Sequence, residues 1–301
     1  MNLAELIRDT EHQLTEAGVH FGHGTTNAHD EATWLVLHAL SLPLDTELDE
    51  PSIASQPVAV EQQARAAELL RMRISTRQPL AYLTREAWLH GVSFYIDERA
   101  IVPRSLIAEA IADGSVDPWL TDRTRRVLDL CTGNGSLAVL AALAWPETTV
   151  EAADISAEAL AVARINVDRH GLSERISLVE SDGLARCQGP YDLILCNPPY
   201  VNSASMDALP AEYRAEPSLA LAGGTDGMDF IRMLLTATPA RLSESGVLVL
   251  EIGHERGHFE AAFPYLAPVW LDTSAGGDQV LLLTREALLL WFTGLRPVGT
   301  P

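Results

Sequence analysis

The sequence Asn197-Pro198-Pro199-Tyr200 follows a short apolar run and contains residues that could bind a planar amino group. Residues 193–196 are all apolar, which is typical of a strand covered on both faces. The two prolines lack a backbone N–H and have a fixed φ, so they end the strand in a stiff, extended turn. The Asn197 side-chain oxygen and the Pro198 carbonyl are then free to accept both hydrogens of an –NH₂ group, and Tyr200 can stack on it.

Such an arrangement suits the methylation of an amide or aromatic amine. The nitrogen of these groups is a poor nucleophile because its lone pair is delocalised. Two acceptors would hold the nitrogen in place and shift electron density toward it. Taken alone, the motif only modestly favours this chemistry over an ordinary proline-rich turn, and a methyl-donor site upstream would make the chemical interpretation strong.

A glycine-containing turn upstream indicates a nucleotide-like ligand. It follows the expected strand 127–130, which contains Asp129, and consists of Cys131, Thr132, Gly133, Asn134, Gly135 and Ser136. Glycines let the backbone approach a ligand closely and turn sharply into a helix. A dinucleotide-binding fingerprint, G-x-G-x-x-G, is the rival interpretation, but its third glycine is missing here.

Acidic residues also end the next two expected strands. Asp154 follows residues 150–153, and Asp182 follows residues 176–179. An acidic residue at the first of these positions bonds ribose hydroxyls in both methyltransferases and dinucleotide-binding proteins, so it does not separate them. A lone aspartate at a strand end is usually a turn residue. Three aspartates at successive strand ends, Asp129, Asp154 and Asp182, in register with a glycine turn are not well explained as turn residues.

Strands and helices alternate from residue 126 onward, which predicts an α/β fold with a doubly wound sheet. The seven expected strands are 127–130, 150–153, 176–179, 193–196, 246–251, 269–271 and 280–283. Parallel strands of such sheets bind ligands beyond their carboxyl ends. The glycine turn and the Asn-Pro-Pro-Tyr turn are therefore expected at the same edge.

The remaining chain predicts two further parts. Residues 1–85 show helical spacing of apolar residues and no strand pattern, which predicts a small helical domain. Residues 86–104 predict a β-hairpin linking it to the sheet domain, 105–301. Arg104, between this hairpin and a helix, is a candidate site contact. The last residues, 295–301, are expected to fray.

Composition restricts the possible partners. The net charge of −20 disfavours binding to a nucleic-acid duplex and favours a basic partner. No apolar run is long enough to span a membrane, and the first residues lack a signal-peptide pattern. Three unevenly spaced cysteines fit a reducing cytoplasm and neither a disulfide framework nor a zinc site. The histidines at 20, 23, 29 and 38 have no fixed pairing, so no metal is expected.

The motifs together resemble a known family. The 129–135 turn is similar to the Asp-x-Gly-x-Gly-x-Gly loop of class I S-adenosylmethionine methyltransferases, with Cys131 at the first glycine position. Combined with residues 197–201, Val102-Pro103-Arg104-Ser105 and a helical N-terminal domain, it resembles the HemK-like protein-glutamine methyltransferases. Similarity to the PrmB branch is carried by Phe21-Gly22-His23-Gly24-Thr25, Ala81-Tyr82-Leu83-Thr84, Phe94-Tyr95-Ile96-Asp97-Glu98-Arg99 and Leu209-Pro210-Ala211-Glu212-Tyr213. It extends from about residue 20 to about residue 285.

The resemblance implies S-adenosyl-L-methionine as donor and S-adenosyl-L-homocysteine as product. The implied donor-binding residues are Asp129, Cys131, Thr132, Gly133, Gly135, Asp154, Ile155, Asp182, Gly183 and Asn197. The ribose is expected at Asp154 and the adenine near Asp182. The aromatic residue that family members often have after this second aspartate is absent, so the sequence identifies no group that stacks on the adenine.

The implied acceptor is a glutamine of the third large-subunit ribosomal protein, a basic partner. The family implies that Asn197 and Pro198 grip the amide, that Tyr200 packs on it, and that Pro199 and Arg104 contact the substrate. Transfer is then a direct in-line displacement that depends on positioning and desolvation, without a general base. Because the enzyme is strongly acidic, we expect it to act on the free protein or an early assembly intermediate, before RNA covers the substrate.

Three alternatives remain at this level. The sister branch methylates peptide-chain release factors and shares the catalytic half, but not the N-terminal stretches. A DNA adenine-N6 methyltransferase uses the same grip after base flipping, but it needs a basic groove. A donor-binding assembly factor without catalysis would not require Asn197, Asp129 and Gly133. Nothing in the sequence indicates an oligomeric state.

Overall fold

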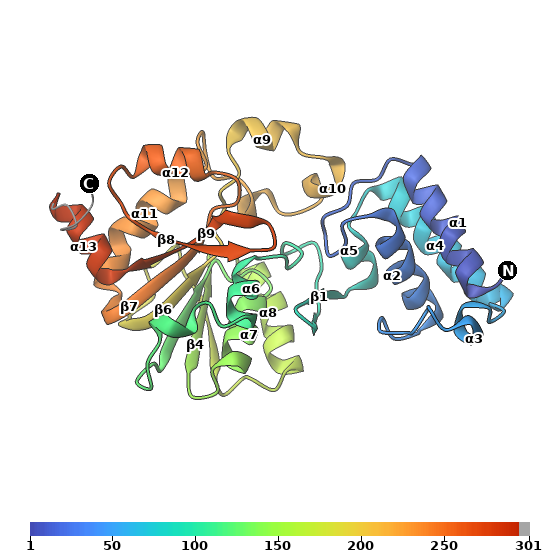
Figure 1. Cartoon of the computed structure of the whole chain (residues 1–301), viewed down its shortest axis with the longest axis horizontal. Coiled ribbons are helices and arrows are strands. Elements are labelled where there is room, and N and C mark those ends of the chain that lie inside the picture. Colours follow the sequence, from blue (N-terminus) through green and yellow to red (C-terminus); the bar gives the residue numbers. More distant parts are fainter. Residues whose placement is uncertain (295–301) are drawn as a thin grey trace.

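Two lobes of unequal size make up the structure, which is a computed structural model (Figure 1). The chain starts in the smaller, helical lobe and passes through a short hairpin into a larger lobe built on one sheet. The structure describes residues 1–294, so the tail predicted to fray, 295–301, lies outside the described residues. Within residues 1–294, no helix is long and apolar enough to cross a membrane.

The helical lobe consists of five helices that share one apolar core. They are α1 (Leu3–Glu16), α2 (Ala28–Leu40), α3 (Pro51–Ala54), α4 (Val60–Thr76) and α5 (Leu80–Thr84). Asn27 caps the start of α2, because its side chain accepts a hydrogen bond from the Asp30 N–H. Leu14, Leu35 and Leu70 are among the buried residues that hold α1, α2 and α4 together. The short helices α3 and α5 were not predicted.

The linking hairpin is present but shorter than predicted. Strands β1 (Ala87–Leu89) and β2 (Val92–Phe94) pair antiparallel, whereas residues 95–104 form no strand. Instead, Ile96, Ala100 and Val102 are buried in the core of the helical lobe, together with residues of α8 from the sheet lobe. The linker is therefore a packed part of the molecule. We retain 1–85, 86–104 and 105–301 as a proposed division of the chain.

The predicted seven-stranded sheet is confirmed. Its strands are β3 (Arg126–Leu130), β4 (Thr149–Asp154), β5 (Ile176–Glu180), β6 (Tyr191–Cys196), β7 (Leu242–Glu251), β8 (Val269–Thr273) and β9 (Gly276–Thr284). Their order is β5-β4-β3-β6-β7-β9-β8, and only β9 runs antiparallel to its neighbours. The chain reverses its direction of growth between β3 and β6, and this switch point is where such sheets bind ligands.

Helices cover both faces of the sheet, which explains the continuous apolar strands. One face packs on α6 (Ile107–Ala112), α7 (Ser136–Ala144) and α8 (Ala157–Arg169). The other packs on α11 (Asp229–Ala237), α12 (Arg256–Ala262) and α13 (Arg285–Thr293). Short 3₁₀ helices occupy Asp117–Trp119, Ser218–Ala220 and Thr238–Ala240.

A segment between β6 and α11 connects the sheet lobe to the helical lobe (Figure 1). It contains α9 (Ser203–Ala208) and α10 (Ala211–Arg214). The Glu212 carboxylate of α10 lies 3.3 Å from Arg73 and 3.2 Å from Arg77 of the helical lobe, and it accepts the His20 N–H at 3.0 Å. Arg73 is buried and also pairs with Glu31 at 2.7 Å. These paired charges hold the two lobes in contact.

Candidate active site

The glycine turn between β3 and α7 forms an open cradle at the switch point. Cys131, Gly133 and Gly135 all have φ between 56° and 80°, the left-handed region. A Cβ at Gly133 would meet no atom within 4 Å, whereas one at Gly135 would lie 3.1 Å from the Ala163 Cβ on α8. Gly133 therefore leaves space for a ligand, and Gly135 lets the turn pack on α8. Cys131 also has a left-handed φ, a conformation that favours glycine.

Asp129 lies behind this turn, fully buried. Its Oδ2 accepts hydrogen bonds from the Thr132 hydroxyl and the Ala138 N–H, and its Oδ1 has no partner among the described residues. Burial raises the pKa of Asp129 to about 7, against the opposing effect of these two hydrogen bonds. Asp129 and Thr132 thus hold the shape of the turn from inside.

The raised pKa of Asp129 predicts a pH-dependent stability difference between the wild type and an Asp129→Asn variant. Between pH 5 and 6.5 the native carboxyl holds its proton and the unfolded one has lost it. Stability of the wild type should therefore fall with rising pH, relative to the variant, by about 1.4 kcal/mol per pH unit. Urea unfolding of both proteins across this window measures the slope. Parallel curves would contradict a raised pKa.

Asp154 at the end of β4 is tied to the same turn. Its Oδ2 accepts the Gly133 N–H at 2.9 Å and its Oδ1 accepts the Ser156 N–H at 2.9 Å. Burial raises the pKa of Asp154. The adjacent Ile155 is half exposed, and both residues line a cavity at the carboxyl ends of the strands.

This cavity brings together much of the predicted site. It has a volume of about 310 Å³, within the range of small-molecule pockets. The predicted residues that line it are Cys131, Gly133, Asp154, Ile155, Asp182, Gly183, Asn197 and Pro199. Other predicted residues, namely Asp129, Thr132, Gly135, Pro198, Tyr200 and Arg104, are not part of its lining. Of these, Asp129, Thr132 and Gly135 shape the turn behind it.

Asn197 is the polar residue of the turn after β6 that lines this cavity. Strand β6 lies beside β3 with Cys196 opposite Leu130, which places Asn197 next to the glycine turn. Within residues 1–294 the Asn197 side chain has no hydrogen-bond partner. The neighbouring thiol of Cys131 interacts with Cys196, and this interaction together with burial raises the pKa of Cys131. The thiol is therefore neutral and unsuited to act as a nucleophile.

Tyr200 is anchored by a carboxylate that sequence reasoning missed. Its hydroxyl donates to Glu251 Oε1 at 3.2 Å, at the end of β7. Glu251 also accepts the Ser105 hydroxyl at 2.6 Å and the Leu106 N–H at 2.9 Å. A Cβ at Gly253 would lie 2.5 Å from the Tyr200 ring, so the ring packs directly on the backbone there. Glu251 thus joins two motifs that are about 100 residues apart.

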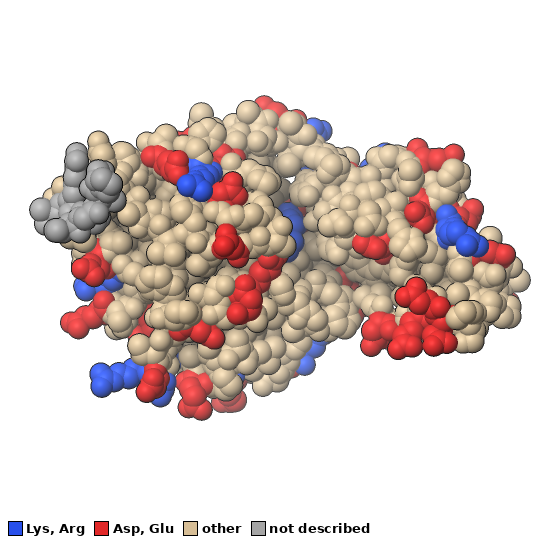
Figure 2. Space-filling view, viewed as in Figure 1, with Lys and Arg blue, Asp and Glu red and all other residues tan. Residues whose placement is uncertain are grey.

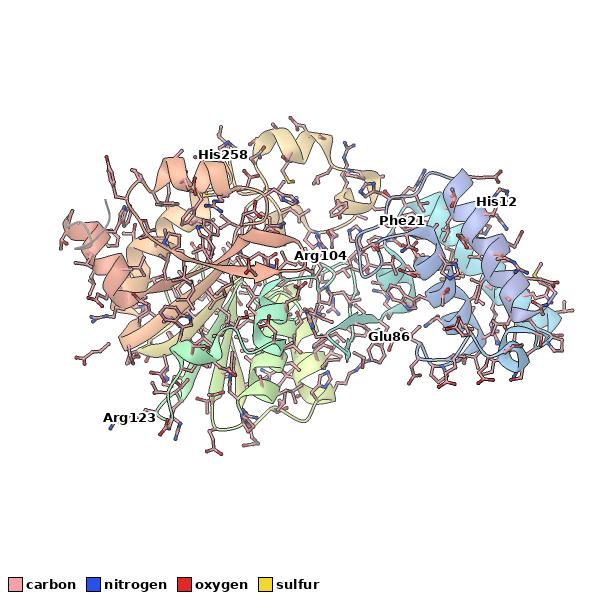
Figure 3. The ribbon with its side chains drawn as sticks, viewed as in Figure 1. His12, Phe21, Glu86, Arg104, Arg123 and His258 are labelled. Carbon is pink, nitrogen blue, oxygen red and sulfur yellow. The ribbon has the colours of Figure 1, made fainter. Side chains whose placement is uncertain are left out.

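Arg104 lies between the two lobes (Figure 3). Both of its Nη atoms donate to the Glu216 carboxylate at 2.7 Å, and its guanidinium lies 5.3 Å from the centre of the Tyr213 ring. Glu109 of α6 accepts hydrogen bonds from the backbone N–H and the hydroxyl of Ser274 at the β8–β9 turn.

Phe230 and Met233 of α11, and Leu219 before it, are cavity residues that sequence reasoning missed. Phe230 lies next to Gly183, where a Cβ would be 3.9 Å from the Phe230 ring. It supplies an aromatic wall near Asp182, where the expected aromatic is absent.

We therefore expect Phe230→Ala to weaken donor binding about tenfold, because a stacking face is lost. Calorimetric titration with S-adenosyl-L-homocysteine measures the dissociation constant. Phe292→Ala, which removes a half-exposed ring on α13, is the control and should leave it unchanged. Equal affinity of the Phe230 variant and the wild type would show that the ring does not contact the ligand.

The histidines show no sign of a metal site. His29 pairs with Glu11 at 2.9 Å, and His23 is buried against Tyr213 with ring centres 4.3 Å apart. No group of three or more metal-ligating side chains occurs in the part of the chain that the structure describes. All three cysteines are free.

Comparisons with known proteins identify the class and the family of this chain. Residues 116–212 match the family model of the methyltransferase small domain. Ribosomal protein uL3 glutamine methyltransferase of Bordetella pertussis is 55% identical over 95% of this chain and 96% of its own length. The protein of the same name from Burkholderia pseudomallei is 51% identical over 94% of both chains. Among solved structures, the hMettl16 catalytic domain in complex with a 3′UTR hairpin has a TM-score of 0.52 and 16% identity, over 74% of this chain and 80% of that chain, which shows a shared fold.

The protein is a class I methyltransferase, whose cofactor is S-adenosyl-L-methionine. Its doubly wound seven-stranded sheet, with a glycine cradle at the switch point, and the match to the family model define this class. The identity over nearly the whole chain narrows this class. The chain belongs to the family of ribosomal protein uL3 glutamine methyltransferases.

Proposed function

We propose that the protein transfers a methyl group from S-adenosyl-L-methionine to the side-chain amide nitrogen of a glutamine in ribosomal protein uL3. The family supports the substrate. The observation that carries the chemistry is Asn197, which lines the cavity and whose side-chain amide has no partner within residues 1–294. An unpaired amide beside a nucleoside-sized cavity suits the binding of a second amide.

The donor is proposed to occupy the cavity, where it supplies an electrophilic methyl group on a sulfonium. The backbone at Cys131 and Gly133 would accommodate its amino-acid portion. Asp154 and Ile155 would contact the ribose, while Asp182 and Phe230 would contact the adenine. Once the donor is bound, apolar lining residues such as Ile155 and Phe230 would exclude water around it and strengthen the polar contacts within the site.

The acceptor is proposed to lie against the turn after β6. The Asn197 Oδ1 and the Pro198 carbonyl would each accept one hydrogen of the glutamine amide, with Tyr200 packed beside it and held by Glu251. The nitrogen–methyl bond forms as the carbon–sulfur bond breaks, and the surplus proton leaves to solvent. Fixing the nitrogen in line with the methyl carbon accounts for most of the catalysis.

A parallel methylation assay tests this function. The protein is incubated with labelled donor and, separately, purified uL3, a peptide-chain release factor and duplex DNA, followed by mass mapping of any product. We expect label on one glutamine of uL3 only. Label on the release factor instead would assign the chain to the branch that methylates release factors, and label on DNA would overturn amide methylation.

The timing of methylation follows from charge. Acidic side chains outnumber basic ones on the face shown in Figure 2, in keeping with the net charge of −20. We propose that the substrate is free uL3 or an early assembly intermediate in the cytoplasm, because an RNA-covered particle would repel this surface. The helical lobe is the proposed recognition domain. Free uL3 should be methylated at least about tenfold faster than purified large subunits, and equal rates would contradict this proposal.

A further inference from the structure

A buried carboxylate connects the candidate acceptor side of the site to the helical lobe. The Glu216 side chain is fully buried, and its two oxygens accept the two Nη groups of Arg104 at 2.7 Å. The same carboxylate accepts the Val102 N–H at 2.9 Å and lies 3.3 Å from Nε2 of His23. Arg104 and Val102 belong to the linker motif, whereas His23 belongs to the helical lobe.

The contact at His23 is tight. Its ring lies 4.3 Å from that of Tyr213, and the Arg104 guanidinium lies over the same Tyr213 ring. A Cβ at Gly22 would come within 2.3 Å of the Tyr213 hydroxyl, so only glycine allows this approach. Burial favours a neutral Glu216, but Arg104 and His23 outweigh it and hold the pKa of Glu216 at about 2. The carboxylate is therefore charged at any physiological pH.

The chain neighbours of Arg104 and of Glu216 both contribute to the candidate active site. Ser105, next to Arg104, donates to Glu251, which also holds Tyr200. Pro217, next to Glu216, lines the donor cavity. A guanidinium held by a fork of two parallel hydrogen bonds has one fixed orientation. Loss of the fork would leave the Arg104 guanidinium only its 3.0 Å hydrogen bond to the Val102 carbonyl, which permits rotation, and would remove no group from the donor cavity.

We propose that Glu216 is a positioning residue for the protein substrate, fixing the Arg104 guanidinium at the acceptor side of the site. The inference rests on the proposed function, because it assigns Arg104 to contact with a protein acceptor. It predicts that Glu216 affects binding of the protein and not binding of the donor. Glu216 thereby acts through Arg104 and touches no reacting atom.

The test compares Glu216→Gln with Glu212→Gln. Both remove one buried charge from the same junction, but Glu212 contacts only the helical lobe, through Arg73, Arg77 and His20. For Glu216→Gln we expect KM for uL3 to rise at least tenfold, with kcat and the dissociation constant of S-adenosyl-L-homocysteine changed less than threefold. For Glu212→Gln we expect a lower Tm and a KM changed less than threefold. An equal rise in KM for both variants, or none for Glu216→Gln, would overturn the proposal.

A double-mutant cycle with Arg104→Lys supplies the second measurement. If the two side chains act as a unit, Glu216→Gln should add less than twofold to the KM of the Arg104→Lys variant, whereas multiplicative effects would overturn the proposal. Should Glu216→Gln fail to fold, Glu216→Asp is measured in its place, because it keeps the charge on a shorter side chain that cannot form the same fork. A wild-type KM for Glu216→Asp would also overturn the proposal. Wild-type enzyme runs in every assay, so failure to methylate uL3 at all is recognised as failure of the proposed function instead.

Discussion

Asn197→Ala is expected to lower kcat for methylation of uL3 about 1,000-fold while the dissociation constant of S-adenosyl-L-homocysteine changes less than about tenfold. The Asn197 oxygen is proposed to accept a hydrogen of the glutamine amide. Removing one positioned hydrogen-bonding group from a water-excluded site typically costs 100- to 1,000-fold in rate. Misplacement of the weakly nucleophilic nitrogen should put the loss at the upper end of that range.

Folding should be unaffected by this change, since no described residue bonds the Asn197 side chain. Single-turnover kinetics with saturating donor measure the effect, and a thermal melt checks the fold. Asn202→Ala is the matched control: Asn202 caps α9 five residues later and bonds Glu255. That variant should lose about 1 kcal/mol of stability with the methylation rate kept within threefold. A rate above one tenth of wild type for Asn197→Ala would remove Asn197 from the chemistry.

Gly133→Ala is expected to weaken donor binding about 100-fold. The glycine has a φ of +56° and faces space free of protein atoms within 4 Å, inside the cavity. A methyl group there would occupy the volume proposed for the donor and would also strain the left-handed backbone. Loss of a close backbone approach removes several contacts at once, which corresponds to about 2.7 kcal/mol of binding free energy.

Gly171→Ala separates the effect of backbone strain from the effect of filling the volume proposed for the donor. Gly171 has a φ of +66°, its added Cβ would also meet nothing within 4 Å, and it lies at the end of α8 outside the cavity lining. Both variants should therefore lose a similar free energy of unfolding, about 1 kcal/mol, and only Gly133→Ala should lose donor affinity. Calorimetric titration with S-adenosyl-L-homocysteine measures the difference. Equal affinities for the two variants would mean that the donor lies elsewhere.

Patterns local in sequence predicted much of this fold and site. The alternation of apolar strands with helices predicted all seven strands of the sheet, because burial of both faces needs continuous apolar runs. The position of Asn197 followed from the two prolines after it, which force the chain out of the sheet. The rule that parallel sheets bind ligands at a switch point placed Asp154, Asp182 and Asn197 around one cavity.

Such local patterns could not predict contacts between residues that are distant in sequence. Phe230 supplies an aromatic wall from a helix 47 residues after Gly183, the residue it lies against. Tyr200 was expected beside an amide, and the fold adds Glu251 as the group that holds its hydroxyl. Arg104 was expected at the site, and the fold binds its guanidinium to Glu216, a residue without any distinguishing pattern. His23, for which the sequence indicated no fixed pairing, is buried at the junction of the lobes.

The sequence by itself determined the class of fold, the order of the motifs and the rigid turn that presents Asn197, because backbone geometry and apolar periodicity are properties of neighbouring residues. Only the tertiary structure decided which side chains pair across the lobes and which close the cavity. Those pairings depend on how helices and loops pack in three dimensions, where a carboxylate is bound by whichever donors the fold brings within 3 Å.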